Sequence, residues 1–281
     1  MTIKKIFNVR YIFFIALIIF GNLIVFELVA SNRFKQYSLE KKSKLQEKSI
    51  FFDRRSRYQY IRDAYFEKGE ILYPSISPGY FMRRIVIKDF LPLSDMSRKN
   101  LLYCNESGKY IKYLSNDYGF RSNFSAKQLK NRRIIARNED KSINLKQAFW
   151  LLGDSFVQGG CVSNESTFEN TIIKKFPNSE VFSFGRGGTS VGIQLAIFKE
   201  YIADYLSQND IVFIFHYPSN DFYEVKAESK NKIINSYFDS DRFSQNLISE
   251  RVNKRKDEFM LSYTKNYISN FDTKEKNKIP F

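Results

Sequence analysis

The sequence predicts an α/β fold with a parallel sheet, preceded by one amino-terminal transmembrane helix. Three apolar runs, each ending in a loop rich in Gly, Ser or Asn, alternate with segments whose apolar residues recur at helical spacing. Such alternation is typical of β-α-β units, in which the strands are parallel and the crossovers right-handed. A separate apolar stretch, Tyr11 to Ala30, is long enough to span a bilayer.

The first apolar run, Phe149 to Leu152, lies in the stretch AFWLLGDSFVQGGCV and predicts a buried strand. The run stops at Gly153, so Asp154 and Ser155 lie at the carboxyl end of this strand, where ligands bind in open α/β sheets. A helix N-cap is the alternative explanation for these two polar residues, because Asp and Ser are both common there.

Two further strands follow, each after a predicted helix. Ser166 to Glu169 has the pattern of a capping box, which predicts that a helix begins there. Val181 to Phe184 is the second strand, and the loop Gly185 to Ser190 separates it from a second helix. Ile211 to Phe215 is the third strand, and because it is wholly apolar we expect it to be covered on both faces.

The carboxyl ends of these strands bring three unusual loops to one edge of the predicted sheet. Acyl transfer needs a hydroxyl nucleophile and hydrogen-bond donors for the oxyanion of the tetrahedral intermediate. Ser155, Gly188 and Asn220 supply a hydroxyl, a glycine amide and a side-chain amide, one from each loop. We therefore expect a site for acyl-transfer chemistry at this edge.

Three sequence blocks resemble the SGNH (GDSL) hydrolase superfamily. GDSFVQGG is similar to the block that carries its nucleophile, SFGRGGTS to a block with a donor glycine, and SNDF to its Asn-Asp block. The resemblance spans roughly Leu101 to Leu247. It implies that Ser155 is the nucleophile and that Gly188, Asn220 and the Ser155 amide donate to the oxyanion. It also implies a flavodoxin-like three-layer α/β/α sandwich.

A closer resemblance is to a membrane-anchored bacterial branch of this superfamily that is associated with cell-surface glycans. The residues that carry it are Cys104-Asn-Glu-Ser-Gly, the stretch Asn116 to Arg121, and Cys161. It implies a serine esterase or acyltransferase that acts on acylated surface carbohydrate without a cofactor. A metal site has no support from the sequence, because one histidine and two distant cysteines make no ligand cluster.

The catalytic base is where the sequence departs from the superfamily. Its members take the base from an Asp-x-x-His-like block near the carboxyl terminus, whereas the one histidine of this chain is His216. We therefore expect a form truncated before that block, with impaired ester hydrolysis. His216 and Asp154 are secondary candidates for the site. The alternative function is a non-catalytic, membrane-anchored remnant that binds a glycan or a partner chain.

Cys104 and Cys161 are the only cysteines of the chain. An even number in an exported domain fits one disulfide, with two buried thiols as the alternative. The resemblance and the cysteine pair predict that the large domain is periplasmic or otherwise extracytoplasmic. The basic residues that follow the apolar stretch would favour the opposite topology, but large domains translocate largely regardless of such charges.

The net charge of +15 would suit a polyanionic partner. No zinc-finger, RNP or helix-turn-helix pattern accompanies it, so we do not expect nucleic-acid binding. A basic surface that faces anionic lipid or acidic glycan, or that is simply solvated, explains the charge. A dinucleotide-binding loop is also disfavoured, because the third glycine of the pattern beginning at Gly185 falls on Ser190.

The predicted organisation has four parts. They are a membrane anchor at 1–30, a basic stalk at 31–60, an irregular extension at 61–142, and the α/β domain at 143–281, which we expect to be incomplete at its carboxyl end. A cleaved signal peptide is the alternative to the membrane anchor. Lys127 to Ser142 is interpreted as a basic connector, and the stretch after Phe222 as helical.

Overall fold

The computed structural model describes Glu27 and residues 52–84, 90–138, 146–217 and 221–272. The chain forms two compact units, and the larger comprises Asp53–Asn105 and Lys109–Phe281. The predicted membrane anchor, apart from the helical residue Glu27, lies outside the described residues. Among the residues that the structure does describe, no helix has both the length and the apolar character to cross a bilayer.

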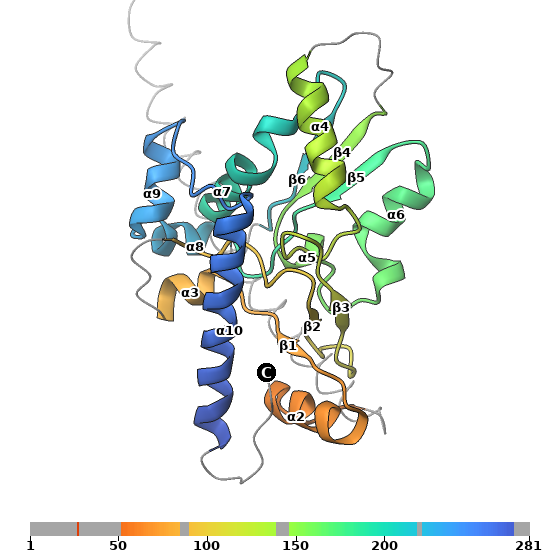
Figure 1. Ribbon diagram of the computed structural model, residues 1–281, viewed down its shortest axis with the longest axis vertical. Coiled ribbons are helices and arrows are strands. Elements are labelled where there is room, and N and C mark those ends of the chain that lie inside the picture. The colour runs from red at the N-terminus through yellow and green to blue at the C-terminus, as the bar shows by residue number, and fades with distance from the viewer. Residues whose placement is uncertain (1–26, 28–51, 85–89, 139–145, 218–220, 273–281) are drawn as a thin grey trace, which may run out of the picture. The chain divides into compact units, whose positions relative to one another are not determined.

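A three-stranded parallel sheet organises the larger unit (Figure 1). Its strands are β4 (Ala148–Leu152), β5 (Glu180–Ser183) and β6 (Ile211–Ile214), in the spatial order β5-β4-β6. The register places Phe149 of β4 opposite Val181 and opposite Ile211. The predicted α/β class, with a parallel sheet at this place in the chain, is confirmed.

Strand β4 is buried on both faces because its side chains alternate between two apolar layers. Ala148, Trp150 and Leu152 belong to the main core, whereas Phe149 and Leu151 belong to a smaller cluster on the other face. The Trp150 indole stacks on a phenylalanine ring of the neighbouring strand. The central strand thus joins two cores that helices must cover from opposite sides.

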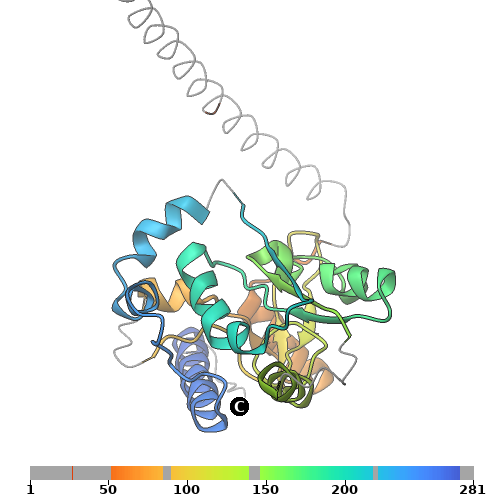
Figure 2. The ribbon, with the colours of Figure 1, turned by 90° about the horizontal axis from the view of Figure 1, so that it is seen from above.

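The crossover helices provide that cover, and α6 and α7 lie on opposite sides of the strands (Figures 1 and 2). Residues of α6 pack on the smaller cluster, and the apolar residues of α7 contribute to the main core. The helical elements between the strands are α5 (Ser155–Gln158), η1 (Asn164–Ser166), α6 (Phe168–Lys175), α7 (Val191–Tyr201) and η2 (Ala203–Tyr205).

The start of α6 differs from the capping box predicted at Ser166. The N-cap is Thr167, whose hydroxyl accepts a hydrogen bond from the Asn170 amide at 3.3 Å. Glu169 turns into the protein instead, where it accepts hydrogen bonds from the Ser122 hydroxyl and the Asn123 amide. Burial raises the pKa of this carboxyl to about 7. The capping box predicted from Ser166 and Glu169 does not form, because the Glu169 carboxylate accepts its hydrogen bonds from Ser122 and Asn123.

In its described part, the segment before β4 forms a second small sheet and three helices. In this sheet β1 pairs parallel with β2, and β2 pairs antiparallel with β3. The sequence interpreted as a basic connector is in part a helix, α4, whose Arg132 is buried and pairs with Glu180 and Asp210. The elements are α2 (Arg57–Lys68), β1 (Tyr73–Pro74), α3 (Pro78–Arg84), β2 (Asn100–Leu102), β3 (Lys112–Leu114) and α4 (Ala126–Asn138).

The predicted helical character of the carboxyl-terminal segment is confirmed. Its helices are α8 (Asp221–Glu228), α9 (Lys232–Asp239) and α10 (Glu250–Asp272). Ile234 and Tyr237 of α9 and Met260 of α10 are fully buried and belong to the main core. These helices are therefore integral to the α/β unit.

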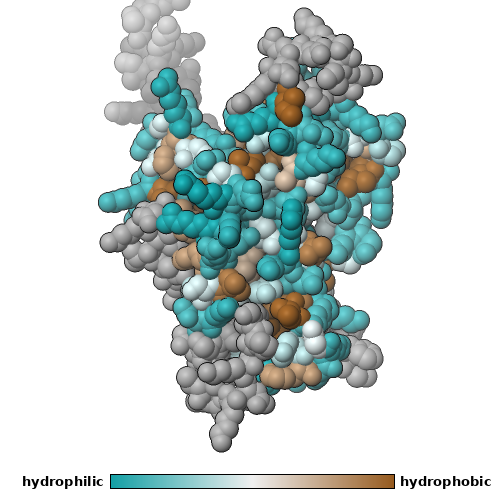
Figure 3. Space-filling model, in the orientation of Figure 1, coloured by the Kyte–Doolittle hydropathy of each residue, from teal (hydrophilic) through white to brown (hydrophobic). Residues whose placement is uncertain are grey.

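Strand β6 contradicts the prediction that its wholly apolar sequence is covered on both faces. It is an edge strand, and Ile211, Phe213 and Ile214 are 38%, 39% and 53% exposed. Elsewhere, the face seen in Figure 3 is largely hydrophilic with small, separate hydrophobic patches. Apolar composition alone does not separate a central strand from an edge strand, and β6 has neither the charges nor the proline that commonly protect an edge.

We expect Ile214→Lys to reduce self-association of the protein, because a charge on an exposed edge opposes intermolecular strand pairing. The free energy of unfolding should change by no more than about 0.5 kcal/mol, since the side chain is half exposed. Light scattering of the full chain in detergent measures the effect. Phe66→Lys is the control, because Phe66 is 50% exposed but lies on helix α2. Equal scattering from wild type and Ile214→Lys would contradict the prediction.

Candidate active site

The loops that follow β4 and β5 meet at a pocket of about 480 Å³. Two of the three predicted catalytic residues, Ser155 and Gly188, line it, and Asn220 lies outside the described residues. The extension before β4 supplies much of the remaining wall. The full lining is Arg57, Pro74, Ser75, Ile76, Ser77, Tyr80, Tyr103, Ser155, Arg186, Gly187, Gly188 and Tyr263.

Ser155 is the first residue of the short helix α5, directly after β4. Asp154 caps this helix, since its carboxylate accepts a hydrogen bond from the Phe156 amide at 2.9 Å. The N-cap alternative therefore holds for Asp154, but not for Ser155. Within the described part of the chain, neither the hydroxyl nor the amide of Ser155 donates a hydrogen bond to the protein. Both groups remain available to a molecule in the pocket.

Gly188 has a backbone conformation and a setting that only glycine fits. Its φ is +68°, and a Cβ there would approach the Ser77 side chain to 2.9 Å. From the other side, a Cβ on Gly79 would meet the Gly188 carbonyl oxygen at 2.6 Å. The Gly188 amide has no acceptor among the described residues. The loop is thus held tightly while this amide stays available.

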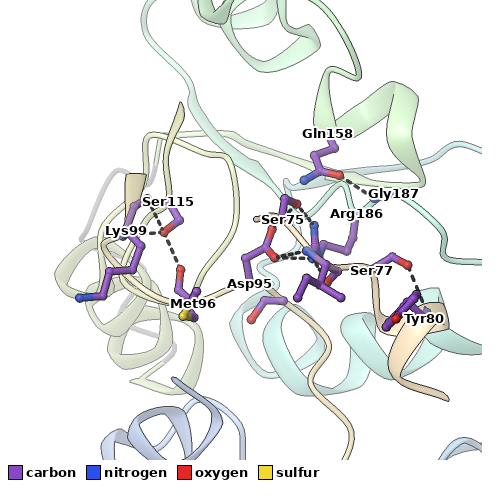
Figure 4. Close-up of polar contacts among 12 residues, drawn as sticks. Ser75, Ser77, Tyr80, Asp95, Met96, Lys99, Ser115, Gln158, Arg186 and Gly187 are labelled. Atoms are coloured by element: carbon purple, nitrogen blue, oxygen red, sulfur yellow. Dashed lines mark hydrogen bonds and ion pairs between the residues drawn. The ribbon is translucent and has the colours of Figure 1, made fainter. Parts of the chain in front are cut away.

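Gln158 connects the serine-bearing helix to the glycine loop (Figure 4). Its side-chain oxygen accepts a hydrogen bond from the Gly187 amide at 2.7 Å, and its side-chain nitrogen donates to the Tyr113 hydroxyl at 3.0 Å. Tyr113 donates in turn to Asp95 at 2.9 Å. Because Gln158 is buried, these bonds fix the loop after β5 relative to α5.

A buried ion pair between Arg186 and Asp95 lies behind the glycine loop (Figure 4). The guanidinium nitrogen Nη2 is 2.6 Å from Asp95 Oδ1, and both side chains are at most 1% exposed. Arg186 also donates to the Ser75 hydroxyl and to the Ile76 carbonyl. Asp95 accepts from the Ser75 hydroxyl at 2.7 Å and from the Ile76 amide at 3.0 Å. The pair therefore binds the extension to the loop after β5.

The loop after α5 has two further supports. The predicted disulfide is confirmed, and it joins Cys104 of the extension to Cys161. Arg121, which is 7% exposed, donates to the carbonyl oxygens of Gly159 and Val162 at 2.6 and 3.0 Å. Both supports anchor the nucleophile loop to the extension rather than to the sheet.

No histidine, aspartate or glutamate is among the described residues that line the pocket. His216 follows β6, and its side chain is exposed. The amide of the neighbouring Phe215 donates a hydrogen bond to the Leu152 carbonyl oxygen at 2.8 Å. The structure thus does not bring His216 into the pocket wall. Tyr103 lines the pocket, but burial raises the pKa of its phenol to about 12.

Several residues of the pocket wall were not predicted from the sequence: Arg57 from the predicted stalk, and Ser77, Tyr80 and Tyr103 from the extension. Attention to strand ends of one sheet could not find them, because a different part of the chain contributes them. One local signal existed. The polar stretch between Pro74 and Pro78 predicts a loop, and loops are where binding residues gather.

Comparisons with protein-family models, with curated proteins and with solved structures find no match for this chain.

Replacing Asp95 with Asn should lower the free energy of unfolding by about 3–5 kcal/mol, because it leaves a buried guanidinium without its counter-charge. Urea unfolding monitored by circular dichroism measures this. Asp241→Asn is the matched control: Asp241 also pairs with a cation, Lys199, but its side chain is fully exposed, so a change within about 0.5 kcal/mol is expected. A loss below about 1 kcal/mol for Asp95→Asn would show that the ion pair does not hold the two segments together.

Proposed function

We propose that this protein is an SGNH-type serine hydrolase-like protein whose pocket binds acyl esters of cell-surface carbohydrate. The observation that carries the proposal is the presence of Ser155 and Gly188 in one pocket, each with a backbone amide that donates to no described group. The flavodoxin-like three-layer sandwich belongs to the same proposal. It is supported by the parallel order β5-β4-β6 and by helices on both faces of the sheet.

In the proposed chemistry the Ser155 hydroxyl attacks the ester carbonyl and the carbonyl oxygen becomes an oxyanion. The amides of Ser155 and Gly188, with Asn220 as a third donor, hydrogen-bond to that oxyanion. Collapse of the tetrahedral intermediate expels the sugar hydroxyl and leaves an acyl group on Ser155, which water or another hydroxyl then removes. The proton of Ser155 must pass to a base for this to be fast.

We expect ester turnover by this chain to be slow, because no carboxylate or imidazole is among the described residues of the pocket wall. General-base assistance typically contributes about 10²–10⁴-fold in rate. This observation also favours the second candidate function, a non-catalytic module that binds the glycan without cleaving it. In both cases the disulfide suits a domain on the non-cytoplasmic side of the membrane, anchored through Tyr11 to Ala30.

A fluorophosphonate probe tests the proposed nucleophile. The full chain, incubated for a long time at high probe concentration, should become labelled at Ser155, slowly because no described base lines the pocket wall, and Ser155→Ala should abolish the label. Ser77→Ala is the control, since Ser77 lines the same pocket and also carries a hydroxyl. Hydrolysis of p-nitrophenyl acetate should stay close to the uncatalysed rate. Peptide mass spectrometry locates the label and absorbance follows the hydrolysis.

Three outcomes separate the two candidate functions. If Ser155 is labelled equally in the wild-type chain and in Ser77→Ala, the result supports the hydrolase-type site. No label on the wild-type chain at high probe concentration rejects a nucleophilic Ser155 and leaves the binding module. Rapid turnover that disappears in His216→Ala would identify His216 as the base and would refute the expected low activity.

A further inference from the structure

The pocket that holds Ser155 carries an unbalanced positive charge. Its wall contains two guanidinium groups, Arg57 and Arg186, and no carboxylate among the described residues. Asp95 neutralises Arg186 through the buried ion pair. Arg57 is therefore the residue that decides the charge of the pocket.

Arg57 is the first residue of α2, and its Nη1 atom donates to the Ser75 carbonyl oxygen at 2.8 Å. This bond orients the guanidinium towards the pocket, while its other N–H groups have no acceptor in the described part of the chain. No described carboxylate forms an ion pair with it. A half-buried, oriented guanidinium that no described carboxylate neutralises is suited to an anionic ligand.

Tyr103 adds a neutral donor beside this charge. A Cβ on Gly187 would collide with the Tyr103 hydroxyl, which places that hydroxyl against the glycine loop. Burial raises the pKa of the phenol to about 12, so it is protonated at neutral pH. The hydroxyl makes no hydrogen bond to another described residue. It can therefore donate to an oxygen of a molecule in the pocket.

Another part of the wall is aromatic. Tyr80 and Tyr263 are joined by a hydrogen bond of 2.9 Å between their hydroxyls, with ring centroids 6.2 Å apart. Aromatic side chains with a polar end offer both an apolar face and hydrogen-bonding oxygens. This combination matches a sugar ring, which has apolar C–H faces and a rim of hydroxyls.

We propose that the pocket binds an acidic carbohydrate, and that Arg57 recognises the carboxylate of a uronic-acid-type sugar. This inference rests on the proposed function and specifies its substrate class. One uncompensated guanidinium balances one negative charge, which suits a carboxylate, and its planar fork matches the two carboxylate oxygens. A phosphate monoester carries about −1.5 to −2 charges at pH 7, which is more than one guanidinium balances.

Two matched probes test the inference, methyl β-D-glucuronide and methyl β-D-glucoside, which differ only in the carboxylate. Ligand-observed NMR titrations of the full chain in detergent at low salt should give about tenfold tighter binding of the glucuronide. Arg57→Gln should remove that difference, because the preference depends on the guanidinium. Lys68→Gln is the control, because it removes the same charge from an exposed position of the same helix and should keep the preference.

Equal binding of the two glycosides by the wild-type chain, including equal absence of binding, would overturn the inference without any variant. A preference lost equally in Lys68→Gln and Arg57→Gln would also overturn it, because net charge would then explain the effect. The fluorophosphonate label at Ser155 separates this test from the test of the proposed function. A chain that prefers glucuronide but is never labelled at Ser155 rejects the ester chemistry alone, and a labelled chain without the preference rejects the acidic substrate alone.

Discussion

The ion pair between Arg186 and Asp95 holds together two parts of the chain that lie far apart in sequence. Arg186 belongs to the loop after β5, and Asp95 to the extension. Removing two charges from water costs several kcal/mol per ion, which good geometry and additional hydrogen bonds must offset. The Ser75 hydroxyl, the Ile76 amide and the Tyr113 hydroxyl supply those bonds to Asp95. One buried pair therefore determines where the glycine loop lies.

The pocket is a consequence of this attachment. The sheet contributes Ser155 and the glycine loop, whereas the preceding segments contribute Arg57, from the predicted stalk, and Tyr80 and Tyr103, from the extension. In the proposed function these two sources have different tasks, since the strand ends provide the nucleophile and oxyanion donors and the preceding segments provide recognition. The Cys104–Cys161 disulfide strengthens the same junction. Substrate preference could then change through the extension while the sheet and its chemistry stay the same.

Local patterns predicted the elements whose environment is local. The buried run of β4, its parallel neighbours and the cysteine pair were all predicted, because apolar runs between helical segments and an isolated pair of cysteines have few alternatives. Two predictions were wrong. The N-cap of α6 was predicted at Ser166 but is Thr167, and the side chains of β6 were predicted to be buried but are largely exposed. Both features depend on contacts with distant parts of the chain. Glu169 accepts a hydrogen bond from Ser122, and β6 pairs with β4 along one edge only. The pocket wall from the extension could not be predicted for the same reason.

A crystal structure of the protein with a phosphonate covalently attached to Ser155 would show whether Ser155 and Gly188 together form an oxyanion hole. The phosphonyl oxygen stands in for the oxyanion of the tetrahedral intermediate. We expect this oxygen to lie about 2.7–3.1 Å from the amide nitrogens of both Ser155 and Gly188. A phosphonyl oxygen that points away from Gly188, or an adduct on another serine of the pocket, would contradict this expectation.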